Sequence, residues 1–210
     1  DDKLKEILTS EFPEYGWLSE ETRDTPERLT KNRVWVVDPI DGTKEFVEGI
    51  PNFVISIGLV ENGIPILGVI HNPINKDTYT ATLGGGVFFN GKQTFIDDKT
   101  EFSKISMLNS ISETRKGLWT PYIPHFKKLI PIGSIALKLA MVAANQVDMV
   151  ASVKPKNEWD ICAGHCLINE AGGILLTLDG KKITYNNPKT LITPGLVAGN
   201  ESVVHSFIKL

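Results

Sequence analysis

The chain has 210 residues, with 22 Lys and Arg against 25 Asp and Glu, so its formal net charge is −3. Hydrophobic residues make up 41% and charged residues 22%, which is close to the averages of globular proteins. These values exclude an acidic disordered chain, collagen and a disulfide scaffold, and they give no global signature of binding to nucleic acid or to a membrane surface. No apolar run approaches the roughly 18 residues that span a bilayer. The length suits one large domain or two small ones.

The first half of the chain predicts one helix followed mainly by strands. Apolar residues recur at helical spacing within residues 3–11 and predict a helix there. Asn62 and Gly63 separate two apolar runs, and this pair is a strong signal for a hairpin turn. Strands are predicted at residues 17–22, 34–37, 53–60, 64–70, 78–82 and 87–89.

The second half mixes helices and strands. Ser134 is the expected cap of a helix over residues 134–145, and Gly172 ends a second helix over residues 160–171. This mixture favours layers of sheets and helices over simple β-α-β winding. We expect two portions, residues 1–132 and 133–210, of one compact unit. Strands are predicted at residues 105–111, 147–151 and 174–178.

Cys162 and Cys166 are the only cysteines, which are too few for a disulfide framework. They lie four residues apart in a helix-like stretch, where a disulfide bridge would have poor geometry. We therefore expect two reduced core thiols and a cytoplasmic protein.

The most informative segment is residues 38–43 (DPIDGT), which follows a buried strand. Asp38 and Asp41 stand three residues apart at the strand end, where carboxylates cost folding energy unless they are paired or bind a metal. Gly42 lets the backbone approach a ligand closely, and Thr43 would open a helix whose free N–H groups suit a phosphate. Carboxylate oxygens are hard ligands that suit Mg²⁺ or Mn²⁺ rather than Zn²⁺. One such aspartate alone is usually only a helix cap.

Three further acids stand at the ends of predicted elements. Glu20 and Glu21 follow a short apolar segment, and Asp160 begins the helix over residues 160–171. Taken singly, the two glutamates are typical surface acids and Asp160 is a typical helix cap. At one edge of a sheet, together with the aspartates of residues 38–43, they would repel one another strongly without cations. The sequence therefore predicts a site for divalent cations.

The chain resembles the inositol monophosphatase superfamily in motifs that occur in the family's order: Ser19-Glu20-Glu21, residues 35–43 (WVVDPIDGT), residues 159–164 (WDICAG) and residues 170–173 (EAGG). This superfamily consists of Mg²⁺-dependent, lithium-sensitive phosphomonoesterases. The resemblance implies a mixed α/β (α+β) fold, an alternating α/β/α/β/α sandwich. It also implies a phosphoric monoester hydrolase that uses two or three Mg²⁺ ions, or Mn²⁺, on a small phosphorylated metabolite. A homodimer is a further implication, without a nucleic-acid polymer or a membrane as partner.

The resemblance also implies a role for each matching residue. Asp38 would bridge two ions, and the full set of metal ligands would be Glu20, Asp38, Asp41, Asp160 and the carbonyl group of Ile40. The catalytic residues would be Glu20, Thr43 and Asp41, with Glu20 and Thr43 orienting the attacking water. Glu21 would contact a metal ion through a water molecule, or would contact the metal ligands and not the metal itself. The substrate contacts would be Gly42, Thr43, Ser134, Lys138 and Asp160.

The substrate stays open between two branches of the superfamily. Residues 133–137 (GSIAL) resemble the pattern of inositol phosphatases and narrowly favour an inositol monophosphatase-like enzyme. Residues 44–46 (KEF), residues 185–188 (YNNP) and Lys138 resemble the 3′(2′),5′-bisphosphate nucleotidases instead, and Lys138 would then meet a second phosphate. On a helix surface, Lys138 would otherwise be an ordinary solvated lysine. A non-catalytic regulator that binds metal or phosphate is the remaining alternative, and the complete set of expected ligands argues against it.

The chain begins at Asp1 rather than Met, so we expect the natural chain to be longer. The resemblance implies that a helical region precedes this point, and that Asp1 and Asp2 end its Thr-x-Ala-Asp motif. An aspartate of that motif can contribute to the site.

Overall fold

The strands before residue 95 form one sheet in which β1 to β7 follow chain order. In the computed structural model, which describes residues 1–210, β1 is parallel to β2 and all later neighbours are antiparallel. Asn62 and Gly63 both have positive φ and form the predicted hairpin turn. The strands are β1 (Gly16–Ser19), β2 (Arg33–Asp41), β3 (Val54–Glu61), β4 (Ile64–Asn72), β5 (Asp77–Thr82), β6 (Gly86–Phe89) and β7 (Lys92–Thr94).

A second sheet has the strand order β12-β14-β10-β8-β9. Its β8, β9 and β10 are parallel, and β14 runs antiparallel between β10 and β12. The strands are β8 (Ser106–Ser110), β9 (Lys128–Ile132), β10 (Met149–Ser152), β12 (Ile174–Thr177) and β14 (Leu196–Gly199). A separate two-stranded ribbon pairs β11 (Lys156–Asn157) with β13 (Leu191–Ile192).

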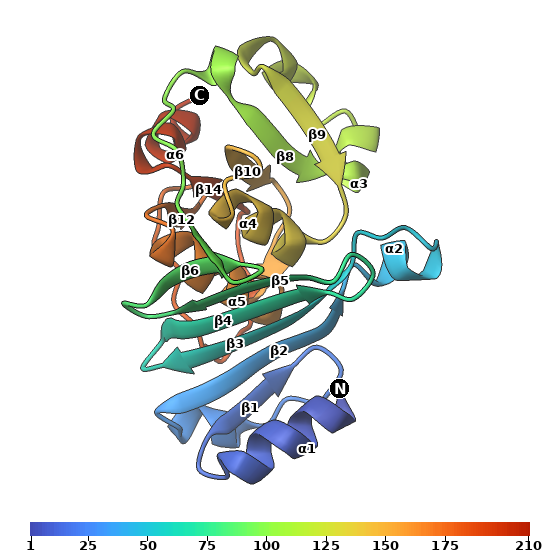
Figure 1. The fold of residues 1–210 in the computed structure, drawn as a ribbon, viewed down its shortest axis with the longest axis vertical. Helices are drawn as coiled ribbons and strands as arrows, with labels where there is room; N and C mark the ends of the chain where they lie inside the picture. The colour runs from blue at the N-terminus through green and yellow to red at the C-terminus, as the bar shows by residue number, and fades with distance from the viewer.

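Helices lie between and outside the two sheets, which gives five alternating layers (Figure 1). The middle layer is α4 (Ile135–Ala143) and α5 (Glu158–Glu170). On the outer faces, α1 (Asp2–Glu11) packs on the first sheet and α6 (Glu201–Ile208) on the second. This arrangement confirms the predicted α/β/α/β/α sandwich. The shorter helical turns are α2 (Thr43–Val47), α3 (Ile111–Arg115) and three 3₁₀ turns, Pro26–Thr30, Phe102–Lys104 and Thr120–His125.

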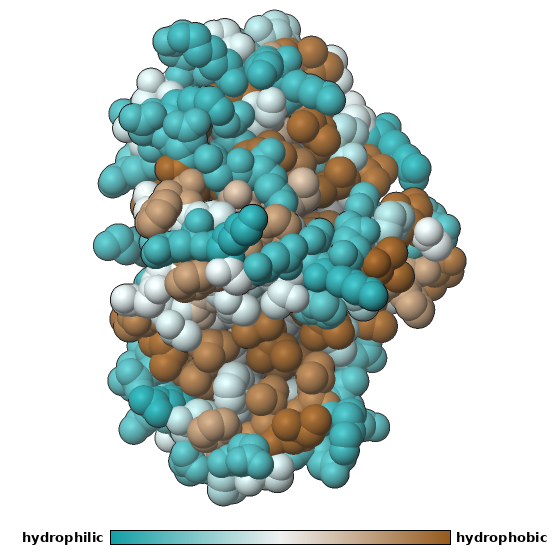
Figure 2. Space-filling view, viewed as in Figure 1, coloured by the Kyte–Doolittle hydropathy of each residue, from teal (hydrophilic) through white to brown (hydrophobic).

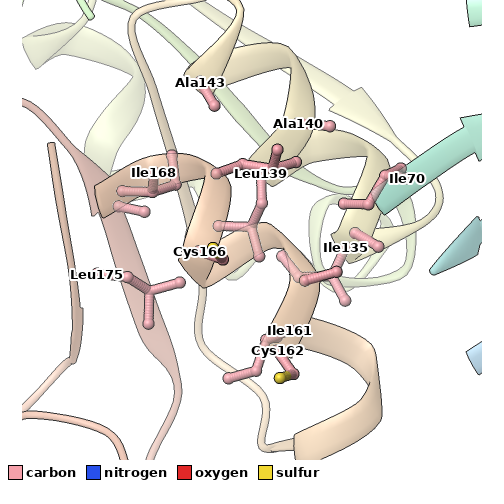
Figure 3. Packing of buried hydrophobic residues seen from close by; sticks show 14 of the residues in the cluster. Ile70, Ile135, Leu139, Ala140, Ala143, Ile161, Cys162, Cys166, Ile168 and Leu175 are labelled. Carbon is pink, nitrogen blue, oxygen red and sulfur yellow. The ribbon is translucent and has the colours of Figure 1, made fainter. Parts of the chain in front are cut away.

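The main core lies between the sheets. Figure 3 shows Leu139 of α4 packed towards the side chains of α5, with Ile70 of β4 nearby. Side chains on both faces of the second sheet pack into hydrophobic cores, because successive side chains of a strand point to opposite faces. On β10, Val150 joins the main core, whereas Met149 packs with α6.

Two glycines allow α5 to approach the first sheet closely. Gly58 on β3 lies opposite Gly68 on β4. A Cβ atom at Gly58 would lie 2.5 Å from Sγ of Cys162, and one at Gly68 would lie 2.4 Å from the carbonyl oxygen of Ala163. Only glycine fits at these distances, so the pair sets how deeply α5 sits on the sheet.

The outer face of the first sheet is partly apolar. In Figure 2, hydrophobic side chains gather in the lower half of the view, over the region of the first sheet and α1. Ile57 and Val69 are partly exposed there, whereas α1 packs against Trp35 and Val37. No helix in the chain has the length and apolar character needed to cross a bilayer.

Most predicted elements are confirmed within a few residues of their expected ends. The helix predicted over residues 160–171 begins at Glu158, so Asp160 is the third residue of α5 and not its cap. Three elements, α6, β9 and β14, were not predicted from the sequence. Both cysteines are free and buried, as expected. The division of the chain after residue 132 stays a prediction, and β8 and β9, which lie on the N-terminal side of this division, belong to the second sheet.

Candidate active site

The end of β2 carries Asp38 and Asp41. In a regular strand, residues three apart point to opposite faces. The pairing of β2 with β3 shifts register between Asp38 and Asp41, and such a bulge re-aims the side chains that follow it. Oδ1 of Asp38 accepts the backbone N–H of Ile40 at 2.9 Å, which holds the turn in place. As a result, the two carboxylates face the same site.

Asp41 is held by the start of α4. Its Oδ2 accepts the hydroxyl of Ser134 at 2.5 Å and the backbone N–H of Ala136 at 2.6 Å. The hydroxyl of Ser134 also accepts the N–H of Leu137 at 3.0 Å, which confirms Ser134 as the cap of this helix. Ser134 has a φ of +51°, a conformation that L-residues rarely adopt and that concentrates at functional sites.

Asp160 enters the site from the first turn of α5. Its Oδ2 accepts the backbone N–H of Asn157, the residue that caps this helix, at 2.7 Å. Its other carboxylate oxygen, Oδ1, accepts no hydrogen bond from the protein. The close seating of α5 on Gly58 and Gly68 brings Asp160 towards the end of β2.

Three carboxylates thus meet at one point. One oxygen from each of Asp38, Asp41 and Asp160 lies within 4.8 Å of the others. Burial and the neighbouring acids raise the pKa of Asp38 to about 9 and that of Asp160 to about 7, and burial raises the pKa of Asp41. Close carboxylates in a desolvated site repel one another, and a divalent cation removes this repulsion. An all-oxygen donor set of this kind fits Mg²⁺ or Mn²⁺.

Glu20 and Glu21 lie beside this cluster. Glu20 follows β1, and its backbone N–H donates to the carbonyl group of Val37 at 3.3 Å. Burial raises the pKa of Glu20, and the charge of Asp41 raises it further. Glu20 is not among the three carboxylates that meet within 4.8 Å. Glu20 and Glu21 are both exposed, so the two predicted site residues are surface acids next to the cluster.

Asp1 supports the turn that carries these two glutamates. Its carboxylate accepts the hydroxyl of Ser19 at 2.6 Å and also accepts the hydroxyl of Thr22. These contacts bracket Glu20 and Glu21 from both sides. Asp1 therefore orders the acidic turn through its neighbours.

Gly42 and Thr43 form the other side of the site. Gly42 has a φ of +98°, and a Cβ atom there would lie 2.8 Å from the carbonyl oxygen of Asn52, so glycine is required. Thr43 begins α2, as predicted. Its hydroxyl donates to the carbonyl oxygen of Ile40 at 3.1 Å, which places two of the predicted site groups side by side.

A cavity of about 380 Å³ opens next to the acids. The predicted site residues that line it are Asp41, Gly42, Thr43, Ser134, Lys138 and Asp160. Further lining residues are Lys44, Glu45, Glu48, Ile50, Ser110, Ile111, Ser112, Arg115, Gly133, Ile135, Pro155 and Lys156. The predicted site residues that do not line it are Asp38, Ile40, Glu20 and Glu21.

Lys138 corrects one interpretation of the sequence. It is 3% exposed, so it is not a solvated lysine. Burial lowers its pKa to about 8, and its ammonium group donates to the carbonyl oxygen of Ile132 at 3.1 Å. No carboxylate lies within salt-bridge distance of it. A buried lysine that faces a cavity in this way is suited to meet an anion.

Lys156 and Arg115 line the same cavity and were not identified from the sequence. Burial lowers the pKa of Lys156, whose ammonium group donates to the carbonyl groups of Lys154 and Pro155. The charge of the fully buried Glu113 partly offsets the lowering of the pKa of Lys138 and Lys156 by burial. Lys156 lies in β11, four residues before Asp160 in the sequence, and this short spacing is the one sequence signal that could have drawn attention to it.

Comparison with known proteins places the fold and the site in context. A model of the inositol monophosphatase family matches residues 1–209. An inositol-1-monophosphatase of Mesorhizobium japonicum is 32% identical over all of this chain and 80% of its own length. A fructose-1,6-bisphosphatase/inositol-1-monophosphatase of Thermotoga maritima is 34% identical over 79% of this chain and 65% of its own length. The crystal structure of the extragenic suppressor protein suhB of Bartonella henselae superposes with a TM-score of 0.84, at 28% identity, over 99% of this chain and 80% of that one.

The layered fold and the acidic site at the strand end define a metal-dependent phosphomonoester hydrolase. Because the family match runs over nearly the whole chain, the chain belongs to the inositol monophosphatase family.

Proposed function

We propose that this protein hydrolyses a small phosphate monoester with water, as an Mg²⁺-dependent inositol monophosphatase-like enzyme. The observation that carries the proposal is the meeting of Asp38, Asp41 and Asp160 within 4.8 Å, beside a cavity that the start of α2 also lines. Relatives named as inositol monophosphatases support an inositol phosphate as the substrate.

The carboxylates of the cluster would hold the ions, with Glu20 and the carbonyl group of Ile40 completing the set. When bound, Mg²⁺ supplies charge neutralisation of the phosphate, activation of a water and stabilisation of the leaving oxygen. Glu20 and Thr43 would orient the attacking water. The backbone N–H groups of Gly42 and Thr43 would bind phosphate oxygens, because Gly42 leaves space for a close approach.

A direct assay tests the proposal. Phosphate release is measured with Mg²⁺ on inositol 1-phosphate, 3′-phosphoadenosine 5′-phosphate and fructose 1,6-bisphosphate, each with and without a chelator. We expect the highest kcat/KM on inositol 1-phosphate, loss of activity with the chelator, and inhibition by lithium at millimolar concentration. Absence of phosphate release from all three compounds would overturn the proposal and leave a non-catalytic binding protein.

A second candidate function is the hydrolysis of a doubly phosphorylated nucleotide. The observation that favours it is the cationic side of the cavity, where the buried Lys138 and the half-buried Lys156 have no carboxylate partner and the exposed Arg115 also lines the cavity. These side chains would bind a second phosphate while the first one reacts beside the acids. A higher kcat/KM on 3′-phosphoadenosine 5′-phosphate than on inositol 1-phosphate would select this candidate.

A further inference from the structure

A buried polar cluster outside the cavity connects the two chain segments that carry Glu20 and Asp160. Its two buried charged members are Arg28, which is 2% exposed, and Glu158, which is fully buried. Neither residue lines the cavity. The cluster is completed by Asp24 and by Asn186 and Asn187, which belong to the loop between β12 and β13.

Glu158 binds this loop with both carboxylate oxygens. Oε2 accepts the backbone N–H of Asn186 at 2.7 Å. Oε1 accepts both the backbone N–H and the side-chain amide of Asn187, each at 2.9 Å. The backbone N–H of Glu158 donates to the carbonyl oxygen of Thr190 at 2.9 Å. The first residue of α5 is therefore fixed to the loop by its main chain and its side chain.

Arg28 binds the same loop from the opposite side. Its guanidinium group donates to Oδ1 of Asn186 at 2.7 Å and to the carbonyl oxygen of Asn187 at 2.9 Å. The side-chain amide of Asn186 returns a hydrogen bond to the carbonyl oxygen of Arg28 at 3.1 Å. Asp24 pairs with the guanidinium group through two hydrogen bonds of 2.7 and 2.8 Å.

The placement of the cluster relates it to the acidic site. Arg28 follows the turn that carries Glu20, and the backbone of Arg28 packs against Gly16 of β1, where a Cβ atom would lie 3.2 Å from Cα of Arg28. Glu158 stands two residues before Asp160 in the first turn of α5. One loop thus joins the segment with Glu20 to the segment with Asp160, and the two acids lie near enough for the charge of Glu20 to raise the pKa of Asp160.

A buried charged cluster is a costly way to stabilise a fold, since an apolar cluster of equal volume is often as stable. Its hydrogen bonds do fix one geometry, and supporting contacts behind metal ligands tune the affinity for the ion. We propose that Arg28 and Glu158 are positioning residues, which hold the first turn of α5 against β1 and thereby set the affinity of the acidic site for a divalent cation. The inference rests on the metal binding proposed above.

The test measures cation binding directly, without substrate. Mg²⁺ or Mn²⁺ is titrated calorimetrically into the chelator-treated full chain and into Glu158→Gln, and thermal unfolding of both metal-free proteins is recorded. We expect the Kd for the cation to rise about fivefold or more in Glu158→Gln. Asn187→Ala is the milder variant, because it removes only the side-chain amide, which donates to Glu158 and to the carbonyl oxygen of Thr184, and keeps the two backbone N–H bonds to Glu158. We expect a smaller rise in Kd.

Glu170→Gln is the matched control. This residue lies at the other end of α5, and its carboxylate accepts the backbone N–H groups of Gly84 and Gly86 at 3.0 and 2.8 Å. We expect Glu170→Gln to lower Tm and to leave the Kd within about twofold of the original value. The same pattern in Glu158→Gln, a lower Tm with an unchanged Kd, would show a purely structural role and overturn the inference.

Two results separate this inference from the proposed function. If the unsubstituted chain binds neither Mg²⁺ nor Mn²⁺, the inference fails together with the proposed metal site. If it binds the cation and Glu158→Gln binds it more weakly, the inference holds even when no substrate releases phosphate.

Discussion

The hydroxyl of Ser134 donates to the carboxylate of Asp41 at 2.5 Å, and this contact joins the end of β2 to the start of α4. Asp41 belongs to the first sheet and Ser134 to the layer between the sheets. The positive φ of Ser134 is the local cost of placing its hydroxyl there. The contact makes the orientation of Asp41 depend on the packing of two layers, and not on its own turn alone.

Replacement of Asp41 by Asn is expected to lower kcat at least about 100-fold, because it removes one negative charge from the proposed metal site while keeping the side-chain volume. The metal-free variant should be at least as stable as the original chain, since one of three repelling carboxylates is gone. Phosphate release measures the change in kcat, and urea unfolding measures the change in stability. Asp98→Asn, at an exposed carboxylate, is the control. Full activity in Asp41→Asn would contradict the role of this residue.

The metal-free protein is expected to become less stable as the pH rises. The pKa of Asp38 is raised from 3.8 to about 9 and that of Asp160 from 3.8 to about 7. From about pH 3.8 to about pH 9, the folded chain holds protons that the unfolded chain has lost. The free energy of unfolding therefore falls as the pH increases through this window. Saturating Mg²⁺ should remove most of the decline, because the cation takes the place of the protons. Urea unfolding across the window, with chelator or with Mg²⁺, measures this. Metal-free stability that stays level or increases with pH would be the opposite result.

Replacement of Lys138 by Met is expected to stabilise the fold and weaken the binding of a second phosphate. Burial lowers the pKa of Lys138 to about 8, so its charge is unfavourable in the folded state at neutral pH. Met fills a similar volume without a charge and should raise the free energy of unfolding by about 1–3 kcal/mol. The kcat/KM for 3′-phosphoadenosine 5′-phosphate should fall more than that for inositol 1-phosphate.

Lys44→Met is the comparison for this variant, since Lys44 lines the same cavity but is exposed. It should change the stability little. Equal losses of kcat/KM on both substrates in Lys138→Met would argue against a contact with a second phosphate.

Replacement of Gly68 by Ala is expected to destabilise the chain by more than about 2 kcal/mol, because the added methyl group would lie 2.4 Å from the carbonyl oxygen of Ala163. The clash involves backbone, so α5 must move away from the sheet. Gly117→Ala provides a contrast: its φ of +71° strains an alanine, but the nearest atom is 3.6 Å away, and the cost should be about 1 kcal/mol. Denaturant unfolding compares the two. A similar cost for both would mean that α5 tolerates a shift.

The sequence was sufficient for much of the fold because the periodic patterns are strong. The Asn62-Gly63 turn and the apolar run of β2 lie where the local signals place them. α6 also carried such a signal, since Val203, Val204 and Phe207 lie on one helical face and are buried, and Asn200 caps the helix. The sequence signal for β9 was weak, because Pro131 lies within this edge strand.

Some residues of the candidate site could be recognised from a local motif, whereas others depend on contacts between distant segments. The motif around Asp38 and Asp41 contains its own turn chemistry, so it could be recognised in the chain. The burial of Lys138 and the place of Arg115 at the cavity depend on the packing of distant segments, because α2, α3 and the starts of α4 and α5 all line this cavity. Pairings between distant segments leave no periodic signal in the sequence, which is why Lys138 was open to a solvated interpretation.

The carboxylates of Asp38 and Asp160 come from different halves of the chain, so they repel one another only after it has folded. An ion that needs all three acids has no equivalent site in the unfolded chain, and its binding energy adds directly to the stability of the native state. The supply of free Mg²⁺ would then govern how much of this protein persists against unfolding and proteolysis in its cell, as well as how fast it works.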